Sequence, residues 1–81
     1  MINNMEIVRH IGVIETNRSG WTRELNVIDW GSGDVYDIRS WAPGHEKCGK
    51  GITISKEALK DLRKLIDTAL ENEESEAANE Q

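Results

Sequence analysis

Alternation of apolar and polar residues predicts four β-strands in the first two thirds of the chain. The strands are expected over residues 6–15, 21–30, 35–41 and 51–54. Asn, Ser, Gly and Asp are concentrated between the first three strands, where they favour tight hairpin turns. Because Pro43 cannot donate a hydrogen bond to a neighbouring strand, the third strand should end near Ala42.

The hydrophobic pattern changes to a helical period after the fourth strand. Ser55 is a suitable N-cap, and apolar side chains recur on one face from Lys56 to about Leu70. The large members of this stripe are Leu59, Leu62, Leu65, Ile66 and Leu70. One helix on one sheet cannot bury a stripe this broad, so we expect it to form a dimer interface. The predicted fold class is α+β, a curved four-stranded antiparallel sheet followed by one C-terminal helix, assembled as a homodimer through that helix.

Length and composition narrow the class of protein. A chain of 81 residues holds one domain with a small core, which strengthens the expectation of a partner subunit. A single cysteine cannot form an intramolecular disulfide, and no signal-peptide pattern or long apolar run is evident. These features predict a cytoplasmic protein that does not enter membranes.

The net charge of -5 is unevenly distributed along the chain. Five of the 15 acidic residues lie beyond residue 70, which leaves ten acids against the ten bases of residues 1–70. The folded part is therefore neutral overall. Residues 1–5 are expected to fray and residues 71–81 to form a disordered acidic tail. The tail either keeps the protein soluble or folds over a binding face as a mimic of phosphate.

The strand pattern also separates two faces of the sheet. If Leu25 and Ile38 face the helix, then Trp30, Arg39 and Trp41 share the opposite face. Their neighbours there, Glu24, Asn26, Asp37 and Thr53, are too polar for an ordinary core. One interpretation is a second small core or a dimer contact, since aromatic residues dominate both. The other is an open surface on which bases stack while cations meet phosphates, as in proteins that bind single-stranded nucleic acid.

Additional cations extend this hypothesis beyond the sheet face. Lys47 and Lys50 lie in the loop before the fourth strand, where neighbouring glycines allow close backbone approach to phosphates. Arg23 is a further candidate contact in the second strand.

The segment from Gly44 to Gly51 differs by one residue from the phosphate-binding pattern G-x-x-x-x-G-K-[ST]. Gly51 replaces the required Ser or Thr, and a strand rather than a helix follows, so a nucleotide-hydrolysing loop is not predicted. His45 and Cys48 provide too few ligands for a zinc site. They also lack an orienting third residue for nucleophilic catalysis. We therefore predict no metal, no cofactor and no enzymatic activity, while retaining a Cys48 and His45 enzyme as the least favoured alternative.

Residues 21–70 resemble the bacterial YdbC-type branch of the positive-cofactor-four family of transcriptional coactivators. The resemblance is carried by Asp37-Ile38-Arg39, by Trp41, and by the run Gly49-Lys50-Gly51-Ile52 that leads into a helix starting at Ser55. It implies a dimer formed mainly through the helix, with single-stranded DNA lying across the exposed sheet surfaces. The family's DNA contacts correspond here to Trp30, Arg39, Trp41 and Lys50. The basic, serine-rich region of eukaryotic members is absent.

Residues and resemblance together predict a homodimer that binds single-stranded DNA with little sequence preference and takes part in transcription or DNA maintenance. Association with the bacterial nucleoid is left open. Binding of RNA is left open, because stacking on base faces does not distinguish the sugar. The alternative is a protein-interaction adaptor of the transcription machinery that uses the same aromatic face.

Overall fold

A computed structural model describes residues 5–79, which form a meander of four antiparallel strands followed by one helix. The strands are β1 (Glu6–Thr16), β2 (Thr22–Asp29), β3 (Asp34–Trp41) and β4 (Cys48–Ile54), and the helix is α1 (Lys56–Asn79). The spatial order is β1-β2-β3-β4, so each strand pairs with its neighbours in sequence. The α+β fold class with an open antiparallel sheet is confirmed.

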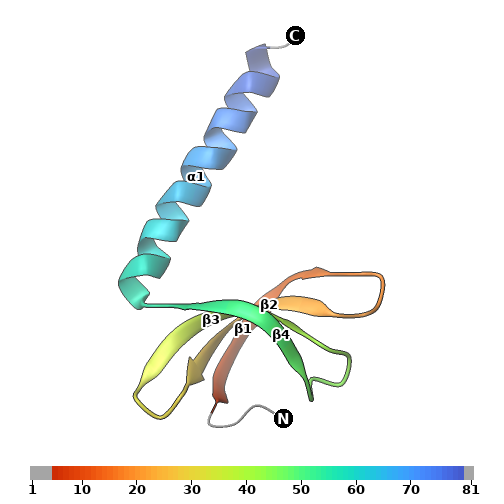
Figure 1. The fold of residues 1–81 in the computed structure, drawn as a ribbon. Coiled ribbons are helices and arrows are strands. Elements are labelled where there is room, and N and C mark those ends of the chain that lie inside the picture. Colours follow the sequence, from red (N-terminus) through yellow and green to blue (C-terminus); the bar gives the residue numbers. More distant parts are fainter. Residues whose placement is uncertain (1–4, 80–81) are drawn as a thin grey trace.

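The strand pairs differ in regularity. β2 and β3 pair without interruption from Thr22 opposite Trp41 to Asp29 opposite Asp34. The pairing of β1 with β2 contains three register shifts, and that of β3 with β4 contains one between Arg39 and Trp41. Such bulges increase the local bend and twist of a sheet. Figure 1 shows the resulting arch of the four strands.

Helix α1 leaves the sheet at the end of β4 and extends away from its convex side (Figure 1). Ser55 caps its first turn, since the Ser55 Oγ accepts a hydrogen bond of 3.1 Å from the backbone N–H of Ala58. The helix continues to Asn79, although the sequence analysis placed its end near Leu70 and a disordered tail beyond. Glu and Ala favour helix, and no Gly or Pro occurs between Lys56 and Asn79 to stop it.

Parts of the expected termini lie outside the described residues. Of the N-terminal segment predicted to fray, residues 1–4 are not described, and of the predicted tail, residues 80–81 are not described. Strand β4 begins at Cys48, three residues before the predicted residue 51, because the bulge extends its pairing with β3. No helix within residues 5–79 is both long enough and apolar enough to span a bilayer.

The most buried side chains lie mainly on the concave face of the sheet, away from the helix. We use "concave face" for the side chains of Glu24, Asn26, Ile28, Trp30, Asp37, Arg39, Trp41 and Thr53. Ile28, Asn26 and Asp37 on this face are fully buried. The sequence analysis expected the face to be open, but the arch folds its side chains together, so that several are shielded without a covering layer.

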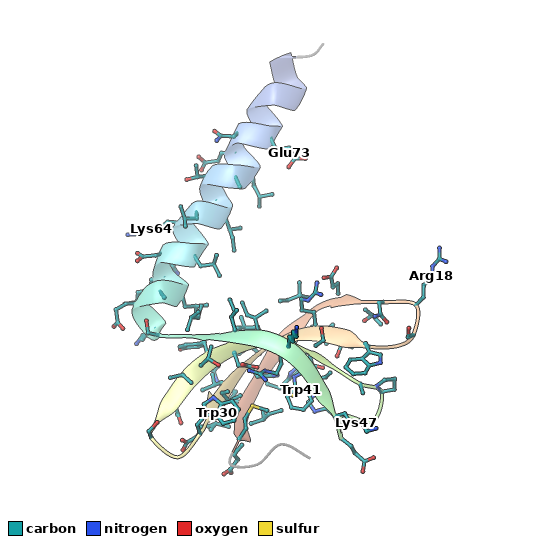
Figure 2. All side chains as sticks on the ribbon, in the orientation of Figure 1. Arg18, Trp30, Trp41, Lys47, Lys64 and Glu73 are labelled. Atoms are coloured by element: carbon teal, nitrogen blue, oxygen red, sulfur yellow. The ribbon has the colours of Figure 1, made fainter. Side chains whose placement is uncertain are left out.

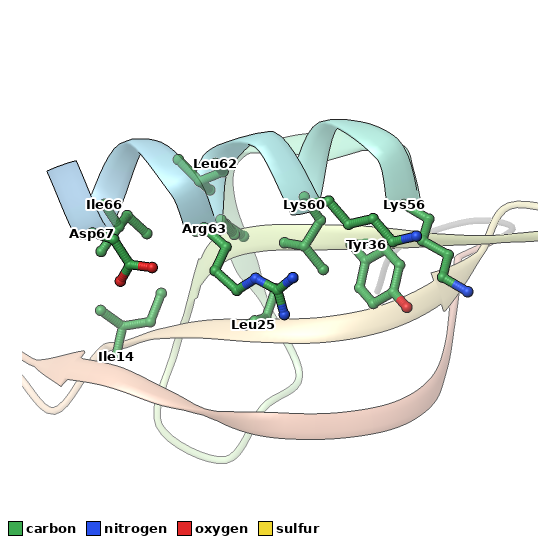
Figure 3. A pocket seen from close by; sticks show the side chains of 11 residues that line it. Ile14, Leu25, Tyr36, Lys56, Lys60, Leu62, Arg63, Ile66 and Asp67 are labelled. Atoms are coloured by element: carbon green, nitrogen blue, oxygen red, sulfur yellow. The ribbon is translucent and has the colours of Figure 1, made fainter.

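The convex side is the less covered one. A cavity of about 510 Å³ separates α1 from the sheet, and its lining is almost wholly apolar. Figure 3 shows the helix above the strands, with Leu25 and Tyr36 below and Leu62 and Ile66 above. The basic side chains of Lys56, Lys60 and Arg63 form part of its rim. Apolar residues on both sides of this space are thus incompletely buried by the single chain.

Candidate nucleic-acid interface

The concave face places side chains from β2, β3 and β4 next to one another. Glu24 pairs with Arg39 across the β2–β3 ladder, and Asn26 pairs with Asp37. Thr53 of β4 lies opposite Asp37 on the other side. Figure 2 shows Trp30 and Trp41 below the arched sheet, on the side away from the helix. Strand alternation alone predicted this grouping.

Asp37 is the centre of one buried polar cluster. Its carboxylate accepts hydrogen bonds from Arg39 Nε at 2.7 and 3.0 Å and from Arg39 Nη2 at 2.8 Å. The Thr53 hydroxyl donates a further bond of 3.2 Å to the same carboxylate. These bonds to Asp37 raise the pKa of the Arg39 guanidinium above its ordinary value, although burial acts in the opposite direction. The charge of Arg39 is therefore largely compensated within the chain.

Arg39 also contacts the ring of Trp30. Its Cζ atom lies 5.9 Å from the Trp30 ring centroid, within the range of a cation–π interaction. Only 13% of the Arg39 side chain is exposed, whereas Trp30 is 39% exposed. The ion pair with Asp37 thus fixes a guanidinium against an aromatic ring that remains accessible to solvent.

Glu24 is the centre of a second cluster. This carboxylate is buried and accepts hydrogen bonds from the Thr22 hydroxyl at 2.6 Å and from Asn26 Nδ2 at 3.3 Å. His45 Nε2 lies 2.9 Å from Glu24 Oε1, and His10 Nδ1 lies 2.7 Å from the Asn26 amide oxygen. Burial acts to raise the pKa of Glu24, but these hydrogen bonds outweigh it, so the pKa lies below its ordinary value of 4.5.

Trp41 is buried, although the sequence analysis expected it to be exposed. Only 4% of it is accessible, because the His45 ring covers it with a centroid separation of 4.0 Å and an interplanar angle of 4°. The buried indole Nε1 has no hydrogen-bond acceptor among the described atoms. Strand alternation assigned Trp41 to the right face, but it could not show that the following loop folds back over the ring.

The other predicted cations occupy different surroundings. Lys47 and Lys50 are exposed, Lys47 just before β4 and Lys50 in the bulged part of that strand. Arg23 lies on the same face of β2 as Leu25, which lines the cavity on the convex side. Its guanidinium donates a hydrogen bond to Glu15 of β1. The structure therefore separates Arg23 from the concave face, while Trp30, Arg39, Trp41 and Thr53 are brought together there.

His45 and Cys48, considered above for metal binding or catalysis, have different partners. Cys48 is half-buried, with its Sγ 3.7 Å from Arg39 Nη1, whereas His45 bonds to Glu24. Within residues 5–79, no three His, Cys, Asp or Glu side chains form a group that could hold a metal ion. The sequence analysis did not predict that Glu24 and His45 organise this face. The position of Glu24, a charged residue within an alternating strand, was the signal that could have indicated its role.

An arched four-stranded meander sheet with a polar, aromatic concave face, followed by one C-terminal helix, defines a small protein of the α+β class. The model of the family described as Transcriptional Coactivator p15 (PC4) matches residues 17–65, which include β2, β3, β4 and the first part of α1. The chain belongs to this family, and the resemblance found in the sequence is confirmed. It is also 39% identical over 64 residues to an uncharacterized protein of Treponema pallidum, covering 78% of this chain and 75% of the relative.

Proposed function

We propose that this protein is a non-enzymatic homodimer that binds single-stranded DNA along the concave face of each sheet and acts in transcription or DNA maintenance. The observation that carries the proposal is the accessible ring of Trp30, held beside Arg39 on a polar sheet face. An exposed ring of this kind can stack on a nucleotide base regardless of its sequence. Membership of a transcriptional coactivator family supports the same function.

The hydrogen-bonded clusters around Asp37 and Glu24 give this face a fixed shape before DNA binds. Asp37 is fully buried and receives bonds from two side chains, Arg39 and Thr53. A preorganised face loses less conformational freedom on binding than a mobile one. Much of the charge of Arg39 is already compensated by Asp37. In this proposal Arg39 therefore acts mainly by orienting Trp30 and by presenting its remaining accessible surface to the DNA.

Phosphate contacts are assigned to the exposed lysines near the bulge of β4. Lys47 and Lys50 are both exposed, and Figure 2 shows Lys47 beyond Trp41, away from Trp30. A single DNA strand whose bases stack on the concave face would bring its phosphates close to these flanking lysines. Because residues 1–70 carry equal numbers of acids and bases, we expect stacking to contribute more of the affinity than charge does.

Dimerisation is proposed through the convex side and the helix. Leu65 is 66% exposed, Leu70 51% and Ile66 48%, and Ile66 also lines the open apolar cavity. A surface this apolar on a small chain is typical of an interface between subunits. A second copy offers the same helix stripe and cavity, so a two-fold arrangement covers both surfaces with one kind of contact.

The function is tested by competition between single-stranded DNA, single-stranded RNA and duplex DNA of one sequence at a fixed salt concentration. The proposal expects saturable binding of the single strands and much weaker binding of the duplex, whose stacked bases hide their faces. Failure to bind any single strand at low salt would contradict it. Recovery of a specific protein partner in that case would favour the adaptor function instead.

A further inference from the structure

The solvent-facing aromatic surface next to Trp41 belongs to His45. The two rings are stacked in parallel, 4.0 Å apart, and Trp41 is only 4% exposed. The side chain of His45 is 42% exposed. Since Trp41 covers one face of the imidazole and Glu24 meets its Nε2 edge, the exposed part of the ring is largely its opposite face.

Two further contacts fix His45 in this position. Its Nε2 lies 2.9 Å from Oε1 of Glu24, a carboxylate that is itself buried and held by Thr22 and Asn26. Its backbone N–H donates a hydrogen bond of 2.9 Å to the carbonyl of Ala42. The imidazole is therefore oriented by a stack, a carboxylate and a tight turn.

The backbone of His45 adopts a conformation that surrounding contacts must stabilise. Its φ of 65° lies in the left-handed region, and it is the one non-glycine residue with positive φ among residues 5–79. This conformation costs a residue with a Cβ free energy, and such costs persist where surrounding contacts compensate for them. Stacking on Trp41 and bonding to Glu24 are the contacts that do so here.

We propose that His45 is the second base-stacking residue of the concave face, with Trp41 as the positioning residue behind it. A nucleotide base placed on the outer face of the imidazole would continue the stack that Trp41 begins. The bound strand would then stack on Trp30 at one end of the face and on His45 at the other. This inference rests on the proposed binding of single-stranded DNA and names an additional residue that carries it.

A competing arrangement uses the same residues differently. A base could displace His45 and stack directly on Trp41, in which case the imidazole would act as a competitor in the free protein. The two arrangements predict opposite signs for the loss of the His45 ring. Removal of the ring weakens binding if bases stack on it, and strengthens binding if it must first be displaced.

The test measures binding of a fluorescently labelled oligothymidine by anisotropy for the wild type, His45→Asn and His10→Asn. Asn tolerates a left-handed backbone and keeps a polar side chain at this position, but it has no ring to stack. His10→Asn is the matched control, because His10 contacts Asn26 in the same polar cluster without stacking on Trp41. We expect His45→Asn to weaken binding about 5- to 100-fold, the range for loss of one stacked base.

Affinity of His45→Asn equal to or tighter than that of the wild type would overturn the proposal, as would equal weakening in His10→Asn. Absence of binding by the wild type would contradict the proposed function itself. Normal binding by the wild type with undiminished binding by His45→Asn would contradict only the inference about His45. A second measurement avoids mutation: NMR signals of the His45 ring protons in the unaltered protein should shift upfield when oligothymidine binds. Unchanged ring signals at saturation would also overturn the assignment.

Discussion

At Gly51 the backbones of β3 and β4 approach so closely that no side chain fits. A Cβ built on Gly51 would lie 2.1 Å from the Cβ of Arg39 and 2.3 Å from the carbonyl oxygen of Ile38. The first atom is attached directly to the backbone of β3 and the second is part of it. Neither can move without disturbing the hydrogen bonds between β3 and β4. This glycine therefore allows the close pairing that positions Arg39 on the concave face.

Gly51→Ala should accordingly destabilise the protein by about 1 to 3 kcal/mol, the usual range for overpacking a well-packed site. Urea denaturation followed by circular dichroism measures the change. Gly12→Ala is the matched control in β1, because a Cβ at Gly12 meets no atom within 4 Å. Equal stability of the Gly51→Ala variant and the wild type would show that β4 does not pair with β3 at this distance.

Glu24 links the stability of the concave face to pH. Its folded-state pKa lies below 4.5, so the ionised carboxylate stabilises the fold above that pH, and this contribution is lost as the pH falls through the folded-state pKa. Glu24→Gln removes the titrating group. We therefore expect the free energy of unfolding to decrease more steeply between about pH 5 and pH 3 in the wild type than in this variant. Parallel curves for the two proteins would contradict the assigned role of Glu24.

Strand alternation predicts which face of the sheet a side chain occupies, but not which partners it meets there. It assigned Trp30, Arg39 and Trp41 to one face, and they lie there. It could not predict that Asp37 would compensate the charge of Arg39, or that His45 would cover Trp41, since both depend on side-chain conformation and on the path of a loop. Alternation identifies a face of a sheet, whereas curvature decides how much of that face water reaches.

Among the elements, α1 differs most from its prediction. The acidic composition beyond Leu70 suggested disorder, yet the same Glu and Ala residues are strong helix formers and α1 extends to Asn79. The strands were easier to predict because Val, Ile and Thr alternate with polar residues between clear turn signals. The start of β4 was missed because a bulge interrupts the alternation before Gly51.

The direction of α1 bears on whether the acidic C-terminal segment folds over the binding face as a mimic of phosphate. The helix extends away from the convex side of the sheet, so it carries residues 71–79 away from the concave face of its own chain (Figure 1). Truncation after Leu70 should therefore change the affinity for oligothymidine by less than about twofold at physiological salt, where charges beyond about 8 Å are largely screened. A marked increase in affinity on truncation would favour the acidic segment as a competitor for the DNA site.

For the molecule as a whole, the exposed apolar residues of α1 and the open cavity are the surfaces through which we propose that it dimerises. Ile66 lines that cavity and remains 48% exposed in the single chain. Ile66→Asp should abolish the homodimer, because a carboxylate buried without a partner is strongly unfavourable. Sedimentation velocity should give about twice 9.2 kDa for the wild type and the monomer mass for this variant.

Lys64→Asp provides the control for dimerisation, since Lys64 is exposed on the same helix and does not line the cavity. It should remain dimeric, which separates the effect of the apolar position from that of added charge. A monomeric wild type, or a dimer unaffected by Ile66→Asp, would contradict the proposed interface and leave the apolar cavity without its expected occupant.

The central claim is that single-stranded DNA stacks on the accessible aromatic surface of the concave face, and Trp30 tests it most directly. We expect Trp30→Ala to weaken binding of a labelled oligothymidine about 5- to 100-fold, while Trp30→Phe, which keeps a flat ring, remains within a few-fold of the wild type. Circular dichroism and sedimentation must show that both variants are folded and have the wild-type mass. Unchanged affinity of a folded Trp30→Ala variant would contradict the claim.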